Sequence, residues 1–123
     1  MNDQLTKHKY INLETFRKSG IGVRTPVWFI QDDSVIYVRT LADSAKVKRV
    51  RKNGQVQIAV CKVDGALLGE WLPAEAREVR DGDLDRKVDH LLDLKYGLTK
   101  KMFDLLTGLR GYKSTILEVK ARQ

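Results

Sequence analysis

Hydrophobic and polar residues alternate with a period of two along most of the segment between Tyr10 and Asp64. This period is typical of β-strands, in which successive side chains point to opposite faces. Ile11, Leu13 and Thr15 share one face of a first predicted strand. That strand reaches a hairpin at Lys18-Ser19-Gly20, where glycine can adopt a positive φ. The first half of the chain is therefore predicted to be sheet.

A second strand is predicted from Ile21 to Ile30, and Pro26 lies within it. Because proline has no N–H to donate to a neighbouring strand, this strand must lie at a sheet edge or contain a bulge or break. A turn at Asp32-Asp33-Ser34 leads into a third strand, Val35 to Thr40, rich in β-branched and aromatic residues. Together, these three consecutive strands are predicted to form a β-meander.

Helical spacing appears in two later segments. A short helix is expected from Asp43 or Ser44 to Asn53, with two valines three residues apart on one face. The clearest helix opens at Asp81-Gly82-Asp83 and closes at Gly97, because its apolar residues recur every three or four positions. The other predicted elements are the strands Gln55–Asp64, Leu67–Arg80 and Tyr112–Ala121, and a short helix from Thr99 to about Leu106.

These elements predict an all-β-dominated fold with inserted helices. The 123 residues suffice for one domain with a core, so we expect a single domain over residues 1–123. About six antiparallel strands favour a closed or partly closed barrel, because closure removes exposed sheet edges.

Composition indicates an ordinary globular protein, with 42% hydrophobic and 32% charged residues. The N-terminal residues are polar, and no stretch approaches the roughly 18 consecutive apolar residues of a membrane-spanning helix. We therefore expect a cytoplasmic protein without a membrane partner. The net charge of +7 favours anionic partners, such as phosphates, polyglutamate, nucleic acid or acidic lipids.

Most of this excess charge lies between Arg39 and Lys52, where Asp43 is the single acidic residue. The cations of this stretch are Arg39, Lys46, Lys48, Arg49, Arg51 and Lys52. A helix N-terminus presents unpaired N–H groups and a partial positive charge, so Ser44 and Lys46 in the first turn could hold a phosphate. A basic run of this kind can also be a solvated helix face that only aids solubility. Its position directly after a strand that ends in Arg39-Thr40 favours the anion site.

Three segments, in this order and spacing, carry a resemblance to a known family: Thr25-Pro26-Val27-Trp28-Phe29, Tyr37-Val38-Arg39-Thr40 and Asp43-Ser44-Ala45-Lys46-Val47-Lys48-Arg49. The chain resembles the pyridoxamine 5'-phosphate-oxidase-like split-barrel superfamily of flavin-binding and deazaflavin-binding proteins. It is most similar to the branch of oxidoreductases that depend on coenzyme F420.

The resemblance implies a homodimer of six-stranded antiparallel split barrels, with cofactor sites at the subunit interface. It implies an oxidoreductase that binds coenzyme F420 or FMN and transfers a hydride to or from a small organic substrate. Arg39, Thr40, Ser44 and Lys46 would hold the cofactor phosphate. Thr25, Pro26, Val27 and Trp28 would line the ring system. Lys48 and Arg49 would complete the phosphate site or meet an anionic tail.

The residues offer few alternatives for catalysis. The sequence has no paired-histidine metal motif, nucleophile elbow, Walker A loop or dinucleotide glycine motif. Asp85, Asp89 and Asp93 recur every four residues, and a solvated helix face explains them better than acid chemistry or a divalent ion. His8 and His90 have no companion at ligand spacing, and Cys61 is expected to be a buried strand residue. Flavin chemistry requires no catalytic base of the protein, and we predict none.

Two other functions remain open at this point. Within the same superfamily, the chain could be an FMN oxidase or an FMN carrier without catalysis. Alternatively, a small basic β-barrel could bind nucleic acid. Nucleic acid is disfavoured, because aromatic residues make up only 7% of the chain and the basic stretch contains none for base stacking.

Overall fold

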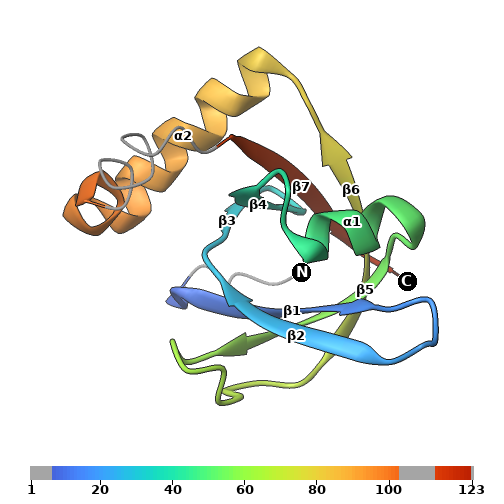
Figure 1. Cartoon of the computed structure of the whole chain (residues 1–123). Coiled ribbons are helices and arrows are strands. Elements are labelled where there is room, and N and C mark those ends of the chain that lie inside the picture. The colour runs from blue at the N-terminus through green and yellow to red at the C-terminus, as the bar shows by residue number, and fades with distance from the viewer. Residues whose placement is uncertain (1–6, 103–112, 123) are drawn as a thin grey trace.

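A computed structural model describes residues 7–102 and 113–122 of the chain. Within these ranges, seven strands and two helices of eight or more residues follow one another in the order ββββαββαβ (Figure 1). The strands are β1 (Tyr10–Phe16), β2 (Gly22–Val27), β3 (Ile30–Asp32), β4 (Val35–Leu41), β5 (Gln55–Cys61), β6 (Leu72–Val79) and β7 (Ser114–Ala121). The helices are α1 (Ala45–Lys52) and α2 (Gly82–Tyr96).

All seven strands form one sheet in the order β2-β1-β5-β6-β7-β4-β3. Every neighbouring pair is antiparallel, so the predicted all-β-dominated, antiparallel fold is confirmed. The sheet curves into a half-barrel whose two edges are β2 and β3 (Figure 1). These edge strands are consecutive in the chain and are joined only by Trp28 and Phe29.

The predicted number of six strands was wrong by one. The second predicted strand, Ile21 to Ile30, is divided into β2 and β3 at Trp28-Phe29. The chain crosses there from one sheet edge to the other, which a single continuous strand cannot do. The prediction that Pro26 requires an edge position is confirmed, because β2 pairs only with β1.

The main core lies inside the curved sheet and is covered by α1. Ile11 and Leu13 of β1 are fully buried there, as the alternating pattern predicts. The fully buried Val47 and the nearly buried Val50 attach α1 to this core. The opposite face of α1 consequently points away from the core.

The longer helix α2 covers a second, smaller hydrophobic cluster on the other part of the sheet. Val88 and Leu92 pack there against Ile30 and Ile116. The Asp81 side chain accepts hydrogen bonds from the backbone N–H groups of Asp83 and Leu84, which caps the helix N-terminus.

Gly97, at φ +56°, ends α2 where the glycine predicts it. The predicted helix after it lies partly outside the described residues, and residues 98–102 are helical. The predicted start of the final strand at Tyr112 also lies outside them. The strand predicted from Leu67 to Arg80 is shorter in the structure, where β6 begins at Leu72. Leu67 forms only an isolated bridge with Cys61.

Candidate functional site

The basic stretch forms α1 as predicted, with Ser44 immediately before its first turn. The Ser44 side chain makes no capping hydrogen bond, and its Oγ is buried without a partner among the described residues. A buried hydroxyl normally finds a hydrogen-bond partner. This hydroxyl can therefore still bind a further polar group.

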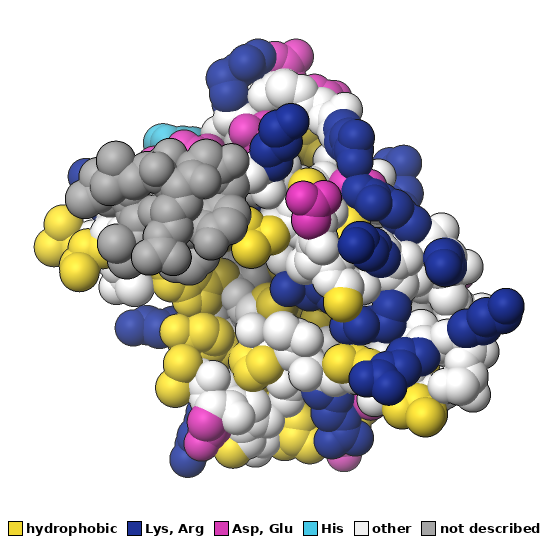
Figure 2. All heavy atoms as spheres, in the orientation of Figure 1, with side chains coloured by type: hydrophobic (Ala, Val, Ile, Leu, Met, Phe, Trp, Pro, Cys, Tyr) yellow, Lys and Arg dark blue, Asp and Glu magenta, His cyan; other side chains and the backbone are white. Residues whose placement is uncertain are grey.

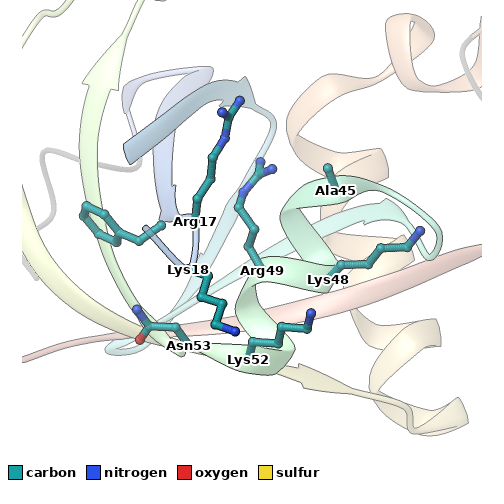
Figure 3. Close-up of a pocket in the computed structure, with 8 residues that line it drawn as sticks. Arg17, Lys18, Ala45, Lys48, Arg49, Lys52 and Asn53 are labelled. Atoms are coloured by element: carbon teal, nitrogen blue, oxygen red, sulfur yellow. The ribbon is translucent and has the colours of Figure 1, made fainter. Parts of the chain in front are cut away.

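A pocket of about 720 Å³ lies between the outer face of α1 and the hairpin that connects β1 to β2 (Figure 3). The hairpin carries Arg17 and Lys18 on one wall, and α1 carries Lys48, Arg49 and Lys52 on the other. The remaining lining residues are Phe16, Ala45 and Asn53. The pocket therefore has five cationic side chains and no acidic one in its lining.

None of these five cations forms an ion pair with a residue that the structure describes. Other arginines do: Arg24 pairs with Glu14 and Arg51 with Glu78. Figure 2 shows the same imbalance at the surface, where lysine and arginine side chains gather over the region of α1 and the hairpin. The pocket is thus an uncompensated positive site suited to an anion.

Arg49 and Lys46 are less exposed than the other cations of α1. The Nε of Arg49 donates a 2.6 Å hydrogen bond to Oγ1 of Thr15, which is fully buried on β1. This bond fixes the guanidinium against the inner wall of the pocket. Lys46 is half-buried next to it, and burial together with the charge of Arg49 lowers the pKa of Lys46. An anion beside these residues would relieve that repulsion.

Three of the residues predicted for the phosphate site are thus close together: Lys46, Lys48 and Arg49, on one helix that begins after Ser44. Arg39 is not with them. Its guanidinium donates to Asp89 Oδ1 at 2.6 Å and to Asp85 Oδ1 at 2.9 Å, both on α2. The alternation of β4 explains this, since Val38 lies in the core with α1 and the next residue points to the opposite face.

Thr40 is half-buried beside Thr115 of β7 and does not line the pocket either. The segment predicted to line a ring system, Thr25 to Trp28, lies on β2 and at the corner after it. Val27 is buried in the core, and Pro26 lies opposite Asn12 of β1. Trp28 stacks on Tyr96 of α2. None of these four residues lines the pocket in a single copy of the chain.

Sequence reasoning missed Arg17 and Lys18 as site residues. Both are exposed next to a predicted turn, where charged residues usually face solvent. Lys52 was identified as part of the basic stretch but not as a binding residue. Only the curvature of the sheet, which brings the hairpin opposite α1, places these residues around one pocket. The signal in the sequence is that no acidic residue occurs between Thr15 and Gln31, the segment that contains Arg17 and Lys18.

Asp85, Asp89 and Asp93 lie on a solvent-exposed face of α2, with 40–53% of each side chain exposed, and they also form a network of ion pairs. Besides the bonds to Arg39, Asp89 and Asp93 each lie 2.9 Å from Nζ of the buried Lys100. Charged residues that are buried normally have such partners. Asp85 and Asp89 therefore hold α2 onto β4 through Arg39, whereas Asp93 pairs with Lys100 in the segment that follows the helix.

Other chemistry has little support in the part of the chain that the structure describes. It contains no group of three or more histidine, cysteine, aspartate or glutamate residues that could hold a metal ion. Burial raises the pKa of the Cys61 thiol, which disfavours a reactive thiolate. No helix within the described ranges has both the length and the apolar character needed to span a membrane.

Comparison with solved structures identifies the fold. No family model and no curated protein matches the sequence. The heme storage protein HutZ from Vibrio cholerae superposes with a TM-score of 0.73 and 17% identity, over 98% of this chain and 87% of the other.

Two further structures belong to the same fold group. A candidate pyridoxamine 5'-phosphate oxidase from Listeria innocua gives a TM-score of 0.69 and 12% identity, over 97% and 88% of the two chains. A FAD-binding protein from Mesorhizobium loti gives 0.66 and 16%, over 97% and 83%. At these identities the comparison establishes architecture rather than activity. The chain has the split-barrel fold of the pyridoxamine 5'-phosphate-oxidase-like proteins.

Proposed function

We propose that this protein is an oxidoreductase that binds a phosphorylated flavin-type cofactor, with coenzyme F420 favoured and FMN second. The observation that carries the proposal is the pocket between α1 and the hairpin, with its five cations that lack an acidic partner among the described residues. The split-barrel fold supports it, since one structure of this fold is that of a FAD-binding protein.

The residues present fit the phosphate of such a cofactor. Arg49, fixed by Thr15, offers free guanidinium N–H groups, and Lys46 adds a half-buried ammonium. The buried hydroxyl of Ser44 has no described partner and can donate to a phosphate oxygen. Lys48 extends the site along the same helix. Ser44 and Lys46 are not in the pocket lining but adjoin Ala45 and Arg49, which are. Arg39 and Thr40 lie on β4 away from this pocket and would contribute only from a second copy of the chain.

The amount of positive charge favours coenzyme F420 over FMN. The phosphate of FMN carries about two negative charges at neutral pH, close to the value for other phosphate monoesters. Five pocket cations exceed what one such group needs. A cofactor that carries further anionic groups matches the pocket better.

When bound, the cofactor would supply the hydride chemistry, and the protein would supply binding, orientation and exclusion of water. Thr25, Pro26, Val27 and Trp28, at the end of β2 and the corner after it, would line the ring system. We propose that a second copy of the chain covers the β2 edge, so that the active species is a homodimer that also receives the small organic substrate. A stable monomer with full cofactor affinity in analytical ultracentrifugation would contradict the homodimer.

The decisive experiment is to purify the protein, record its visible absorption and titrate it calorimetrically with coenzyme F420 and with FMN. We expect saturable binding of both, tighter for coenzyme F420. Binding of FMN alone would favour the FMN oxidase or carrier. Affinity for DNA that falls steeply with salt, without binding of either cofactor, would favour the nucleic-acid-binding module and overturn the proposal.

A further inference from the structure

The two walls of the basic pocket are supported very differently. The α1 wall is fixed by Val47 and Val50 in the core and by the hydrogen bond from Arg49 to Thr15. The other wall is the hairpin tip, residues 17–21, which projects beyond the last β1–β2 pair, Phe16 and Gly22. The backbone hydrogen bonds that the described residues make at this tip are internal, from Arg17 N–H to Ile21 O and from Gly20 N–H to Arg17 O.

The tip lacks side-chain anchors as well. Neither Arg17 nor Lys18 makes a side-chain hydrogen bond or ion pair with any described residue. Ile21 is 57% exposed, so it does not attach the tip to the core. The tip is continued by β2, an edge strand whose only strand partner among the described residues is β1. The ribbon can therefore twist without breaking a second ladder of hydrogen bonds.

The charges on the two walls repel each other in the free protein. Arg17 and Lys18 face Lys48, Arg49 and Lys52 across the pocket, with no acidic residue in the lining (Figure 3). At physiological ionic strength screening acts over about 8 Å, so charges that line one pocket still interact. An anion with several charges would reverse the sign of this interaction, because it attracts both walls at once.

We propose that the tip of the β1–β2 hairpin is a flap that closes on α1 when a multivalent anion enters the basic pocket. The inference rests on the proposed function, since the natural anion would be the phosphorylated cofactor. It adds that the pocket is open in the free protein and that Arg17 and Lys18 hold the bound anion from the hairpin side. Monovalent anions screen the repulsion but cannot bridge the two walls, so they do not close the flap.

Hydrogen–deuterium exchange tests the closure with inorganic tripolyphosphate as the probe. The exchange of the amides of residues 17–21 is compared in tripolyphosphate and in sodium chloride of the same ionic strength. We expect exchange in the tip to slow about three- to tenfold with tripolyphosphate, as the two weak ion pairs of Arg17 and Lys18 would produce. Equal slowing in sodium chloride, or no slowing while tripolyphosphate is bound, would overturn the flap.

A charge-reversal variant provides an independent test without ligand. Lys18→Glu places a carboxylate on the flap opposite the α1 cations, so the tip should be protected in the absence of any anion. Tripolyphosphate should then add little protection. The matched control is Lys62→Glu, an equal charge change at an exposed residue that does not line the pocket. A tip that exchanges equally fast in both variants would contradict the repulsion on which the flap depends.

The outcome separates this inference from the proposed function. Binding of coenzyme F420 or FMN with an unprotected tip would overturn the flap and leave the cofactor site intact. Protection by tripolyphosphate without binding of either cofactor would support the flap and overturn the cofactor assignment. Absence of both responses would overturn both.

Discussion

The indole ring of Trp28 stacks on the phenol ring of Tyr96, with the ring centroids 4.5 Å apart and the planes inclined by 12°. The Tyr96 hydroxyl also accepts a hydrogen bond from the backbone N–H of Phe29 at 3.0 Å. Trp28 and Phe29 are the two residues between the edge strands, where no ladder satisfies the backbone. The end of α2 therefore provides the contacts that a neighbouring strand would otherwise make.

The Tyr96 hydroxyl is the first target for a test of this corner. Tyr96→Phe keeps the stack on Trp28 but leaves the N–H of the fully buried Phe29 without its acceptor. We expect a loss of about 1 to 3 kcal/mol in the free energy of unfolding, measured by urea denaturation. Tyr96→Leu should cost about 0.5 to 1.5 kcal/mol more, because it also removes the ring stack. Equal stability of Tyr96→Phe and the wild type would show that the hydroxyl contributes nothing at this corner.

The burial of Lys95 is expected to make the free energy of unfolding increase with pH in the alkaline range. Burial lowers the pKa of Lys95 to about 8, while its Nζ donates to Phe29 O at 3.0 Å. The ordinary value is about 10.5, so the unfolded chain holds this proton over a range of pH in which the folded protein releases it. The destabilising effect of the buried charge is therefore complete below about pH 8 and is relieved as the pH rises toward 10.5.

We expect the free energy of unfolding of the wild type to rise by on the order of 1 kcal/mol between about pH 7.5 and 9.5, less than the full pKa shift implies because solvent screens the partly exposed ammonium. In Lys95→Met this rise should be absent. The comparison, by urea denaturation, ends at about pH 9.5, below the usual tyrosine pKa of about 10. Parallel pH profiles of the two proteins would contradict the effect of burial on Lys95.

Lys46 tests the cofactor site directly. Lys46→Ala should weaken cofactor binding by about 1.5 to 3 kcal/mol, the range for a charge-assisted hydrogen bond, without unfolding the protein. Calorimetric titration with coenzyme F420 or FMN measures the change. The control is Arg86→Ala, which removes one cation that pairs with Asp83 on α2. An unchanged dissociation constant for Lys46→Ala would count heavily against the proposed site.

Thr15 tests whether the orientation of Arg49 matters for binding. Thr15→Val keeps a β-branched side chain in the strand but removes the acceptor of the Arg49 Nε hydrogen bond. The guanidinium is then free to rotate, and we expect cofactor binding to weaken by about 1 kcal/mol. If Thr15→Val binds as tightly as the wild type, the hydrogen bond has no positioning role.

The ion pair of Glu78 is expected to make the stability of the protein decrease in acid. The hydrogen bond from Arg51 of α1 lowers the pKa of Glu78 on β6 to about 2 from 4.5. Its contribution to stability is therefore fully present above about pH 4.5 and is lost as the pH falls toward 2. Glu78→Gln should reduce this part of the acid dependence, as measured by thermal unfolding between these pH values. An identical acid dependence in both proteins would show that the ion pair does not stabilise the attachment of α1.

Local patterns were sufficient to predict most of the fold. The alternation of Ile11 and Leu13, the valines of α1 and the Asp81 and Gly97 ends of α2 all act within a few residues, and the structure confirms them. The division at Trp28-Phe29 was not predictable from local pattern, because it depends on Tyr96, nearly seventy residues later in the sequence.

The same distinction separates the two parts of the candidate site. Lys46, Lys48 and Arg49 lie on one helix, so their proximity follows from helical spacing alone. Arg39 was placed with them by the family resemblance and by its position at the end of the preceding strand, but strand alternation turns it toward Asp85 and Asp89. Arg17 and Lys18 join the site only through the curvature of the sheet, which no local pattern specifies.

The position of β7 in the sheet has a consequence for how the protein is made. This strand comes after all the others in the chain, yet it lies between β6 and β4 and pairs with both. During synthesis, the β2-β1-β5-β6 ribbon and the β4–β3 hairpin can form early. No pairing between the described strands joins these two parts of the sheet until β7 has left the ribosome. Nascent chains that lack residues after 113 should therefore expose the unpaired edges of β6 and β4, and those edges are where chaperones or premature aggregation would act.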